Sequence, residues 1–262
     1  MSTTAIILAA GRGSRLYPYT EDCPKCLTVL AGMTLLERQI STLRSAGIDD
    51  IVIVSGYLGH MLDVPGTRRV ENPDWSRTNM VESLFAAEDA FGDDLIVAYG
   101  DIVYELGVVE TLLQSPHGIS VCVDSDWRAY WAQRFDDPLS DAESLRLDDH
   151  GRIIDIGSKA AHIDDIQGQY IGLMRFSRGG VEVLRRTRAA LGDIPRPWME
   201  KRNVANAYMT DLLMEMILTG NDLHASFIDG RWVEIDTASD LGLAKTLVTE
   251  IGGGLLRIRA GA

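Results

Sequence analysis

The stretch Ala5-Ile6-Ile7-Leu8-Ala9-Ala10-Gly11-Arg12-Gly13-Ser14-Arg15-Leu16 decides the fold of this chain. It opens with a continuous apolar run as long as a strand, and such a run is typical of a strand buried on both faces of a parallel sheet. The residues after the run are polar and include two glycines, which is the composition of a loop. Ligands bind at the carboxyl ends of parallel strands. The stretch therefore predicts a buried strand that leads into a binding loop.

Outward from this stretch, apolar runs alternate with segments of helical spacing. Further buried strands are predicted at Ile51–Ser55 and Leu95–Tyr99, and helices at Leu35–Ala46 and Asn79–Phe91, each followed by a glycine. A glycine just beyond a helical pattern is a common signal for the end of a helix. The alternation predicts an α/β fold with a doubly wound, mostly parallel, Rossmann-like sheet.

The pattern changes in the second half of the chain, where strands follow one another with few helices between them. Predicted strands lie at Ile119–Val123, Ser144–Leu147, Arg152–Ile156, Tyr170–Phe176 and Trp232–Ile235, and predicted helices near Gly179–Ala190 and Asn206–Leu218. We interpret this half as a mixed extension of the sheet or a lid over its edge. A single domain is expected over residues 1–251, followed by a flexible tail over residues 252–262 that begins with glycines.

The composition of the chain excludes some classes of protein and favours others. The 262 residues suit one large α/β domain, and the net charge of −13 argues against nucleic acid as a partner, because a phosphate backbone requires clustered Lys and Arg. Three cysteines cannot form a disulfide framework, which favours a reducing cytoplasm. The N-terminus lacks a basic segment, and no apolar stretch reaches the length of a membrane span. We expect a soluble cytoplasmic protein without a membrane partner.

The loop after the first strand has the chemistry of an anion site. Gly11 and Gly13 allow positive φ and a close approach of the backbone to a ligand, and successive N–H groups in such a turn attract anions. Arg12, Arg15 and Lys25 add three cations to this stretch of an acidic protein. The combination points to a polyphosphate ligand.

Two better-known phosphate loops do not match. A dinucleotide-binding loop requires a third glycine where Leu16 stands, and the Gly-x-x-x-x-Gly-Lys-Ser/Thr pattern is absent. From the glycine pair alone, a tight turn between strand and helix is an equally good interpretation.

A longer pattern separates these interpretations. Leu8-Ala9-Ala10-Gly11-x-Gly13-Ser14-Arg15-Leu16-x-Pro18-x-Thr20, with Pro24-Lys25 after it, resembles the signature of the sugar-phosphate and choline-phosphate nucleotidyltransferase superfamily. The resemblance implies that the loop wraps a nucleoside triphosphate and that Arg15 and Lys25 are catalytic residues that hold its phosphates. The nucleotide-binding residues that it implies in the loop are Leu8, Ala9, Ala10, Gly11, Arg12, Gly13 and Ser14.

Two aspartates follow predicted strands directly. Asp101 stands in Tyr99-Gly100-Asp101, and Asp236 ends Val233-Glu234-Ile235-Asp236. Carboxylates at the ends of sheet strands are well placed to hold Mg²⁺, which favours one or two carboxylates plus substrate oxygens. Each could instead cap the helix that follows. The resemblance favours Mg²⁺ as the cofactor, since family members carry an aspartate at each place, and it sets Gly100 beside the nucleotide.

A third motif points to the kind of nucleotide. The segment Asn72-Pro73-x-Trp75-x-x-Thr78-Asn79-Met80-x-x-Ser83-Leu84 resembles the phosphocholine-type and phosphonate-type cytidylyltransferases, which depend on CTP. By this resemblance Asn79 and Ser83 contact the base or the acceptor phosphate. The alternative is the start of a helix, with Thr78 or Asn79 as its cap.

The acceptor side carries a weaker resemblance. Asp124-x-Asp126-Trp127 and Arg134-Phe135-Asp136-Asp137-Pro138 resemble segments of phosphonate cytidylyltransferases. Asp124, Asp126, Trp127, Tyr130 and Trp131 would form an acidic and aromatic pocket suited to an ammonium or trimethylammonium group. Core or lid packing is an equally good interpretation of these aromatic rings. Lys159 and Asp211 are further candidates for contacts with the acceptor.

These observations predict a cytidylyltransferase. It would transfer CMP from CTP to a small phosphomonoester or phosphonate, such as phosphocholine, 2-aminoethylphosphonate or 2-hydroxyethylphosphonate, and release pyrophosphate. Residues 1–118 would form the nucleotide-binding half, and residues 119–251 the acceptor and metal half. The alternatives are a sugar-1-phosphate nucleotidyltransferase and a non-catalytic nucleotide sensor; the intact pair Asp101 and Asp236 argues against the sensor. The sequence leaves the acceptor and the oligomeric state open, a homodimer included.

Overall fold

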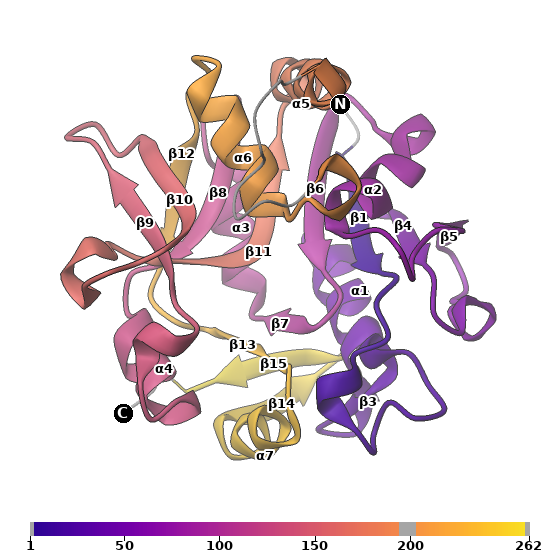
Figure 1. The fold of residues 1–262 in the computed structure, drawn as a ribbon. Helices are drawn as coiled ribbons and strands as arrows, with labels where there is room; N and C mark the ends of the chain where they lie inside the picture. The colour runs from indigo at the N-terminus through magenta and orange to yellow at the C-terminus, as the bar shows by residue number, and fades with distance from the viewer. Residues whose placement is uncertain (1–2, 194–202, 260–262) are drawn as a thin grey trace.

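The computed structural model describes residues 3–193 and 203–259 and confirms an α/β fold around a central sheet (Figure 1). The sheet has seven strands in the order β12-β8-β11-β6-β1-β4-β5. Their bounds are β1 (Thr3–Ala9), β4 (Asp50–Ser55), β5 (Arg68–Glu71), β6 (Asp94–Tyr99), β8 (Ile119–Asp124), β11 (Gln169–Phe176) and β12 (His224–Ile228). The predicted strand from Ala5 lies at the centre, parallel to β4 on one side and β6 on the other.

The second half extends this sheet and also forms a separate ribbon. β11 runs antiparallel to both β6 and β8, whereas β12 runs parallel to β8. The antiparallel pair β9 (Glu143–Leu147) and β10 (Ile153–Lys159) stands apart from the central sheet. A second small pair joins β7 (Ile102–Tyr104) to β13 (Trp232–Glu234). The mixed extension is therefore present, and the ribbon adjoins its edge strand, since Arg152 pairs with His224 of β12.

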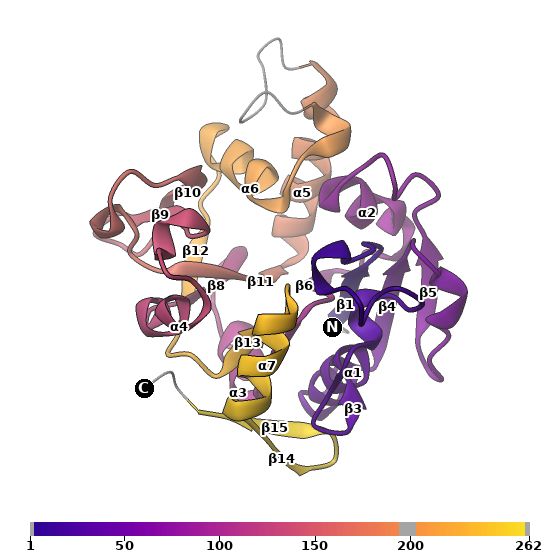
Figure 2. The same ribbon diagram turned by 60° about the horizontal axis from the view of Figure 1, so that its bottom comes forward.

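Helices cover both faces of the sheet, because each buried strand is apolar on both sides. In β1, Ala5 and Ile7 pack into one core and Ile6 into the other. The first core is covered by α1 (Leu35–Ser45), α3 (Leu106–Leu113), α4 (Trp127–Arg134) and α7 (Ala238–Leu247). The second is covered by α2 (Met80–Ala86), α5 (Arg178–Ala190) and α6 (Met209–Leu218), as Figures 1 and 2 show. The result is a three-layer sandwich with two cores.

The helices differ from the expectations in extent and in number. The helix predicted over Asn79–Phe91 ends at Ala86, where the chain tightens into a 3₁₀ turn over Glu88–Ala90. The helices α3, α4 and α7 were not among those predicted, although in α4 the buried residues Trp127, Tyr130 and Trp131 follow helical spacing. Among the described residues, no helix has both the length and the apolar character that crossing a membrane requires.

The segment that was predicted to be a flexible tail, residues 252–262, contains regular structure in the part that the structure describes, which ends at residue 259. β14 (Val248–Gly252) and β15 (Leu255–Ile258) form an antiparallel hairpin. Its glycine-rich turn has positive φ throughout, and Leu256 and Ile258 are buried. The buried Arg38 of α1 donates hydrogen bonds to the carbonyl oxygens of Leu30 in β2 (Val29–Leu30) and of Gly254. These contacts fix the segment beside α1 and β3 (Met33–Thr34) (Figure 2).

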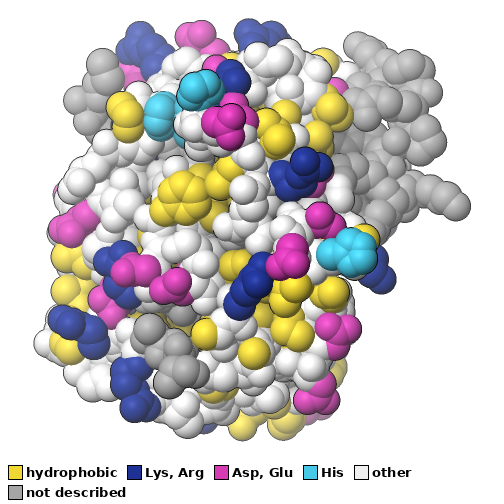
Figure 3. Space-filling model, turned by 90° about the vertical axis from the view of Figure 1, so that its left-hand side faces the viewer, with side chains coloured by type: hydrophobic (Ala, Val, Ile, Leu, Met, Phe, Trp, Pro, Cys, Tyr) yellow, Lys and Arg dark blue, Asp and Glu magenta, His cyan; other side chains and the backbone are white. Residues whose placement is uncertain are grey.

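One face of the molecule illustrates how the charge is distributed. On the described part of this face, basic and acidic side chains are interspersed, and the basic ones do not gather into a continuous patch (Figure 3). Binding along a nucleic-acid backbone requires such a patch.

Two adjacent glycines in α5 allow a matched test of the packing. A Cβ atom on Gly180 would lie 2.2 Å from the carbonyl oxygen of Gly118, whereas one on Gly179 would meet nothing within 4 Å. We expect Gly180→Ala to reduce the free energy of unfolding by about 1–3 kcal/mol, because the backbone must shift. Gly179→Ala should raise it by about 0.5–1 kcal/mol. Thermal and denaturant unfolding give the free energy of unfolding of both variants. Equal effects of the two substitutions would contradict the close packing of Gly180 against Gly118.

Candidate active site

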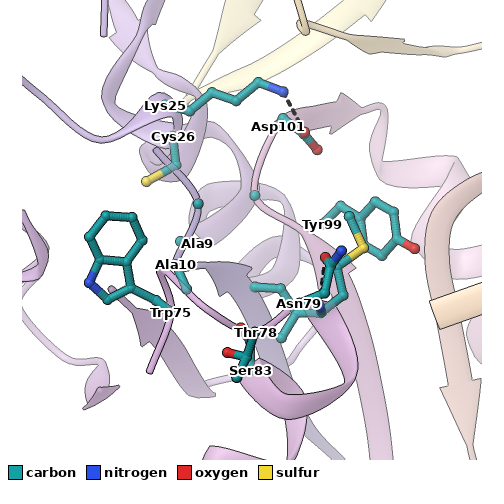
Figure 4. Close-up of a pocket in the computed structure, with 14 residues that line it drawn as sticks. Ala9, Ala10, Lys25, Cys26, Trp75, Thr78, Asn79, Ser83, Tyr99 and Asp101 are labelled. Atoms are coloured by element: carbon teal, nitrogen blue, oxygen red, sulfur yellow. Dashed lines mark hydrogen bonds and ion pairs between the residues drawn. The ribbon is translucent and has the colours of Figure 1, made fainter. Parts of the chain in front are cut away.

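The site lies where the carboxyl ends of β1 and β6 meet. The backbone N–H of Gly100 donates a hydrogen bond to the carbonyl oxygen of Leu8 over 2.9 Å. A Cβ atom at Gly100 would stand 2.7 Å from that same oxygen, so only glycine allows the two strand ends to approach this closely. The contact brings Asp101 beside the loop that follows β1 (Figure 4).

A cavity of about 150 Å³ opens between these strand ends and the start of α2. It is lined by Leu8, Ala9, Ala10, Gly11, Lys25, Cys26, Trp75, Thr78, Asn79, Met80, Ser83, Tyr99, Gly100 and Asp101. In Figure 4 the labelled side chains surround this cavity, with Lys25 and Asp101 on one side and Trp75 and Ser83 on others. The structure thus brings together most of the residues that were predicted to bind the nucleotide; Arg12, Gly13 and Ser14 do not line this cavity.

Asn79 and Ser83 also have structural roles. Asn79 is the N-cap of α2, where its side chain accepts a hydrogen bond from the backbone N–H of Met80 over 2.9 Å. Ser83 Oγ lies 3.1 Å from Asn72 Nδ2 in a buried hydrogen bond. The capping alternative therefore describes Asn79 correctly, and the same residue faces the cavity.

The loop after β1 is shaped by Gly13 and Lys25. Of the two glycines in the loop, Gly13 alone has positive φ, at 69°. A Cβ atom on Gly13 would lie 2.7 Å from Cβ of Lys25, so the missing side chain makes room for the lysine stem. The side chain of Arg12 turns outward and lies over the rings of Tyr17 and Tyr57. Its Cζ is 5.4 Å from the ring centroid of Tyr17 and 5.1 Å from that of Tyr57.

Lys25 bridges the two predicted metal ligands. Its Nζ lies 2.6 Å from Asp101 Oδ2 and also forms an ion pair with Asp236 Oδ1. Arg15 Nη2 lies 3.0 Å from the other oxygen of Asp236. Burial alone would lower the pKa of Lys25, but the two carboxylates outweigh it, and the pKa is raised. Burial likewise opposes ionisation of Asp236, yet Lys25 and Arg15 hold its pKa below the usual range.

A third carboxylate, Glu234, belongs to this cluster and was not predicted. One oxygen each of Asp101, Glu234 and Asp236 lie within 4.8 Å of one another. Burial raises the pKa of Glu234 to about 7, against the opposing effect of Arg134. Glu234 is the last residue of β13 and stands two positions before Asp236, a spacing that places two side chains on the same side wherever the chain stays extended.

The cluster has the composition of a divalent cation site. Asp101 Oδ1 is buried and has no hydrogen-bond partner, so one acceptor oxygen in the cluster is free for a ligand. Carboxylate oxygens are the protein ligands that Mg²⁺ favours. The alternative interpretation, in which Asp236 caps the following helix, does not hold, because Thr237 is the N-cap of α7. The residues present therefore fit a metal ion.

A second cavity of about 260 Å³ lies on the other side of the carboxylates. It is lined by Arg15, Met80, Tyr99, Trp131, Asp141, Glu143, Gln169, Tyr170, Ile171, Gly172, Tyr208, Thr210, Trp232, Glu234 and Asp236. Met80 and Tyr99 also line the first cavity, so the two are neighbours. A reaction between ligands in the two cavities would take place beside the carboxylate cluster.

The structure divides the residues that were predicted to bind the acceptor. Trp131 lines the second cavity and donates a hydrogen bond from Nε1 to Asp141 Oδ2 over 3.1 Å. Trp127 is 1% exposed and packs in the core, in agreement with the interpretation of these aromatic rings as core packing. Asp124 does not line this cavity: it is buried and accepts a hydrogen bond from Trp232 Nε1 over 2.8 Å. Asp126 is exposed at the start of α4.

The remaining acceptor candidates lie outside the second cavity. Lys159 is exposed and lines a smaller cavity of about 180 Å³, which also contains Asp141 and Glu143. Asp211 is buried, and its carboxylate accepts a hydrogen bond from the backbone N–H of Tyr208 over 2.7 Å at the start of α6. Asp141 and Glu143, which line the second cavity, were not predicted.

Comparison with known proteins places this geometry in a family. The chain belongs to the MobA-like NTP transferase domain family, whose model matches residues 5–160. It is 39% identical over 249 residues to the CTP:phosphoglutamine cytidylyltransferase of Campylobacter jejuni, covering 90% of this chain and 97% of that protein. It is 31% identical to the bifunctional IPC transferase and DIPP synthase of Rubrobacter xylanophilus, covering 93% of this chain and 51% of that protein.

A solved structure shows the same fold. The CTP:phosphocholine cytidylyltransferase of Streptococcus pneumoniae superposes with a TM-score of 0.71 at 21% identity, covering 94% of this chain and 99% of that one. The architecture is therefore that of a nucleotidyltransferase across nearly the whole chain.

The position of Lys25 predicts competition with a metal ion. We expect Lys25→Met to lower the Kd for Mn²⁺, measured without nucleotide, by about ten-fold or about 1.4 kcal/mol, because the ammonium no longer neutralises Asp101 and Asp236. Electron paramagnetic resonance measures free and bound Mn²⁺. Arg12→Met serves as the control, since Arg12 contacts tyrosine rings, and should leave the Kd unchanged. Unaltered or weaker Mn²⁺ binding by Lys25→Met would contradict the competition.

Proposed function

We propose that the protein is a Mg²⁺-dependent cytidylyltransferase that transfers CMP from CTP to a small phosphomonoester or phosphonate and releases pyrophosphate. The observation that carries the proposal is the cluster of Asp101, Glu234 and Asp236 between two adjoining cavities. The first cavity would receive the nucleotide and the second the acceptor. The relatives that act with CTP support the choice of nucleotide.

The chemistry requires positioning and charge rather than a base. An oxygen of the acceptor would attack the α-phosphorus of CTP, and the bond from that phosphorus to pyrophosphate would break, with the electron pair leaving on pyrophosphate. The attacking oxygen is already anionic, so no proton has to be removed. Lys25 and Arg15 would stabilise the negative charge that grows on the leaving group.

Asp101, Glu234 and Asp236 would hold Mg²⁺, and the free oxygen Asp101 Oδ1 is the feature that fits it. When bound, the ion supplies positive charge close to the phosphate oxygens. Lys25 would then exchange its ion pairs with Asp101 and Asp236 for the phosphates of the nucleotide. This exchange accounts for a lysine that lies among carboxylates and also lines the nucleotide cavity.

The proposal is tested by pyrophosphate release, with the four nucleoside triphosphates crossed against a panel of acceptors. The panel contains phosphoglutamine, phosphocholine, 2-aminoethylphosphonate, 2-hydroxyethylphosphonate and hexose 1-phosphates. We expect CTP to be preferred by a wide margin, because a wrong base leaves buried polar groups unpaired. Equal rates with CTP and GTP would contradict a cytidylyltransferase, and turnover with hexose 1-phosphates alone would identify a sugar-phosphate enzyme.

The carboxylates provide a second prediction in the same assay. Asp101→Asn and Asp236→Asn should each lower kcat by at least about 100-fold, the size of effect seen when one electrostatic contact to a transition state is lost. EDTA should abolish the wild-type activity, and Mg²⁺ should restore it. Asp63→Asn, at an exposed aspartate paired with Arg69, is the control and should keep wild-type rates. Turnover in EDTA would contradict the metal dependence.

We further propose that the preferred acceptor carries a cationic nitrogen. Asp141 and Glu143 line the second cavity together with the rings of Trp131 and Tyr170. Carboxylates and aromatic faces both attract ammonium and trimethylammonium groups. Phosphocholine and phosphoglutamine, which the named relatives use, each contain such a group.

Asp141 gives the direct test of the acceptor. We expect Asp141→Asn to raise the KM for phosphocholine, phosphoglutamine and 2-aminoethylphosphonate by about ten-fold, the equivalent of ~1.4 kcal/mol. The KM for CTP and for 2-hydroxyethylphosphonate, an acceptor without a cationic nitrogen, should remain the same. Asp149→Asn, in the exposed turn after β9, is the matched control. An equal loss with all acceptors would show that Asp141 does not recognise a cation.

A further inference from the structure

A buried arginine lies behind the carboxylate cluster. Arg134, the last residue of α4, has a side chain that is 0% exposed. Its Nη1 lies 2.7 Å from Glu234 Oε2, and its Nε lies 3.0 Å from Asp240 Oδ1. Nε donates a hydrogen bond to Asp240, whereas the contact of Nη1 with Glu234 is an ion pair. Because the guanidinium group is planar and always charged, it attracts both carboxylates from one rigid group.

The two partners of Arg134 stand on either side of Asp236 in the chain. Glu234 belongs to the cluster itself, and Asp240 lies in the first turn of α7. The second oxygen of Asp240 accepts hydrogen bonds from the backbone N–H groups of Asp236 over 3.1 Å and of Thr237 over 2.8 Å. Arg134 therefore fixes the segment that carries Asp236 at both ends.

The surroundings of Arg134 prevent it from moving away. The ring centroids of Tyr130, Trp131 and Phe135 lie 5.4, 5.2 and 5.0 Å from its Cζ. Tyr130 Oη donates a hydrogen bond to the backbone oxygen of Glu234 over 3.3 Å and accepts one from its N–H over 3.0 Å. The helix α4 thus contacts Glu234 through both side chain and backbone, and it also places Trp131 in the second cavity.

We propose that Arg134 is a positioning residue of the reaction: it holds Glu234 and Asp236 at the separation that a divalent cation requires, and links them to the helix that lines the acceptor cavity. The inference rests on the proposed function, in which these carboxylates bind the cation. Without the guanidinium, neighbouring buried carboxylates repel one another, and the hydrogen bonds of Tyr130 to the backbone of Glu234 do not neutralise this charge.

A role of Arg134 in stability alone predicts a different result. Arg38, a second buried arginine, serves as the comparison. Its side chain is 1% exposed, forms an ion pair with Glu250 and donates to backbone carbonyls, but it joins α1 to the C-terminal hairpin. Arg38→Lys and Arg134→Lys both leave a buried lysine in place of a fork of donors. If Arg134 only stabilises the fold, the two variants should differ from the wild type in the same way.

The experiment measures Mn²⁺ binding by paramagnetic resonance on the purified full chain, with circular dichroism to establish the folded state. We expect Arg134→Lys to raise the Kd for Mn²⁺ by about ten-fold and to raise the KM for the acceptor, while the KM for CTP at saturating Mn²⁺ changes little. Arg38→Lys should lower the melting temperature and leave the Kd for Mn²⁺ unchanged. Asp240→Asn, which keeps an oxygen for the backbone N–H groups but loses its charge, should raise the Kd in the same direction.

A folded Arg134→Lys protein with the wild-type Kd for Mn²⁺ overturns the inference. If Arg134→Lys does not fold, the Asp240→Asn variant tests the inference instead, and a wild-type Kd for Mn²⁺ in that variant also overturns it. The inference is likewise overturned if the wild-type protein binds no Mn²⁺. If the wild type binds Mn²⁺ but releases no pyrophosphate from any nucleotide, the proposed function fails, and the Mn²⁺ titrations still decide the role of Arg134.

Discussion

The ion pairs of Lys25 with Asp101 and Asp236 are the contact on which the site depends. They join three segments that lie far apart in the chain, and each segment arrives by a different route. Lys25 follows the loop after β1, and Asp101 follows β6, the neighbour of β1 in the sheet. Asp236 reaches the same point because β13 pairs with β7, and the N–H of Ile235 bonds the carbonyl oxygen of Asp101 over 3.0 Å.

Opposite charges lie close together around this contact. Three cations, Lys25, Arg15 and Arg134, face four carboxylates, those of Asp101, Glu234, Asp236 and Asp240. Apart from the exposed Arg15, these charges are largely withdrawn from water, so each depends on its partners. An incoming cation and an incoming polyphosphate change the local charge in opposite directions. We regard this as the physical reason that a lysine lies among the carboxylates that we propose as ligands of a metal ion.

The two halves of the chain contribute different parts of the site. The loop after β1, the start of α2 and the end of β6 form the first cavity almost entirely from local strand-end geometry. The second cavity draws on α4, β9, β11, α6 and β13, and of these five elements only β11 belongs to the central sheet. A solved structure at 21% identity shares this fold, so the architecture is retained although most of the sequence differs.

Features that depend on neighbouring residues could be predicted from the sequence. The apolar run into Gly11 predicted β1 and its loop, the helical spacing before Gly47 predicted α1, and aspartates directly after strands predicted two members of the cluster. Features that depend on distant contacts became visible only in the folded chain. Glu234 joins the cluster, Trp127 enters the core, and residues after Gly252 form a hairpin because Arg38 binds Gly254, 216 positions away. No local pattern contains such a contact, since the burial of a side chain is set by the segments that fold against it.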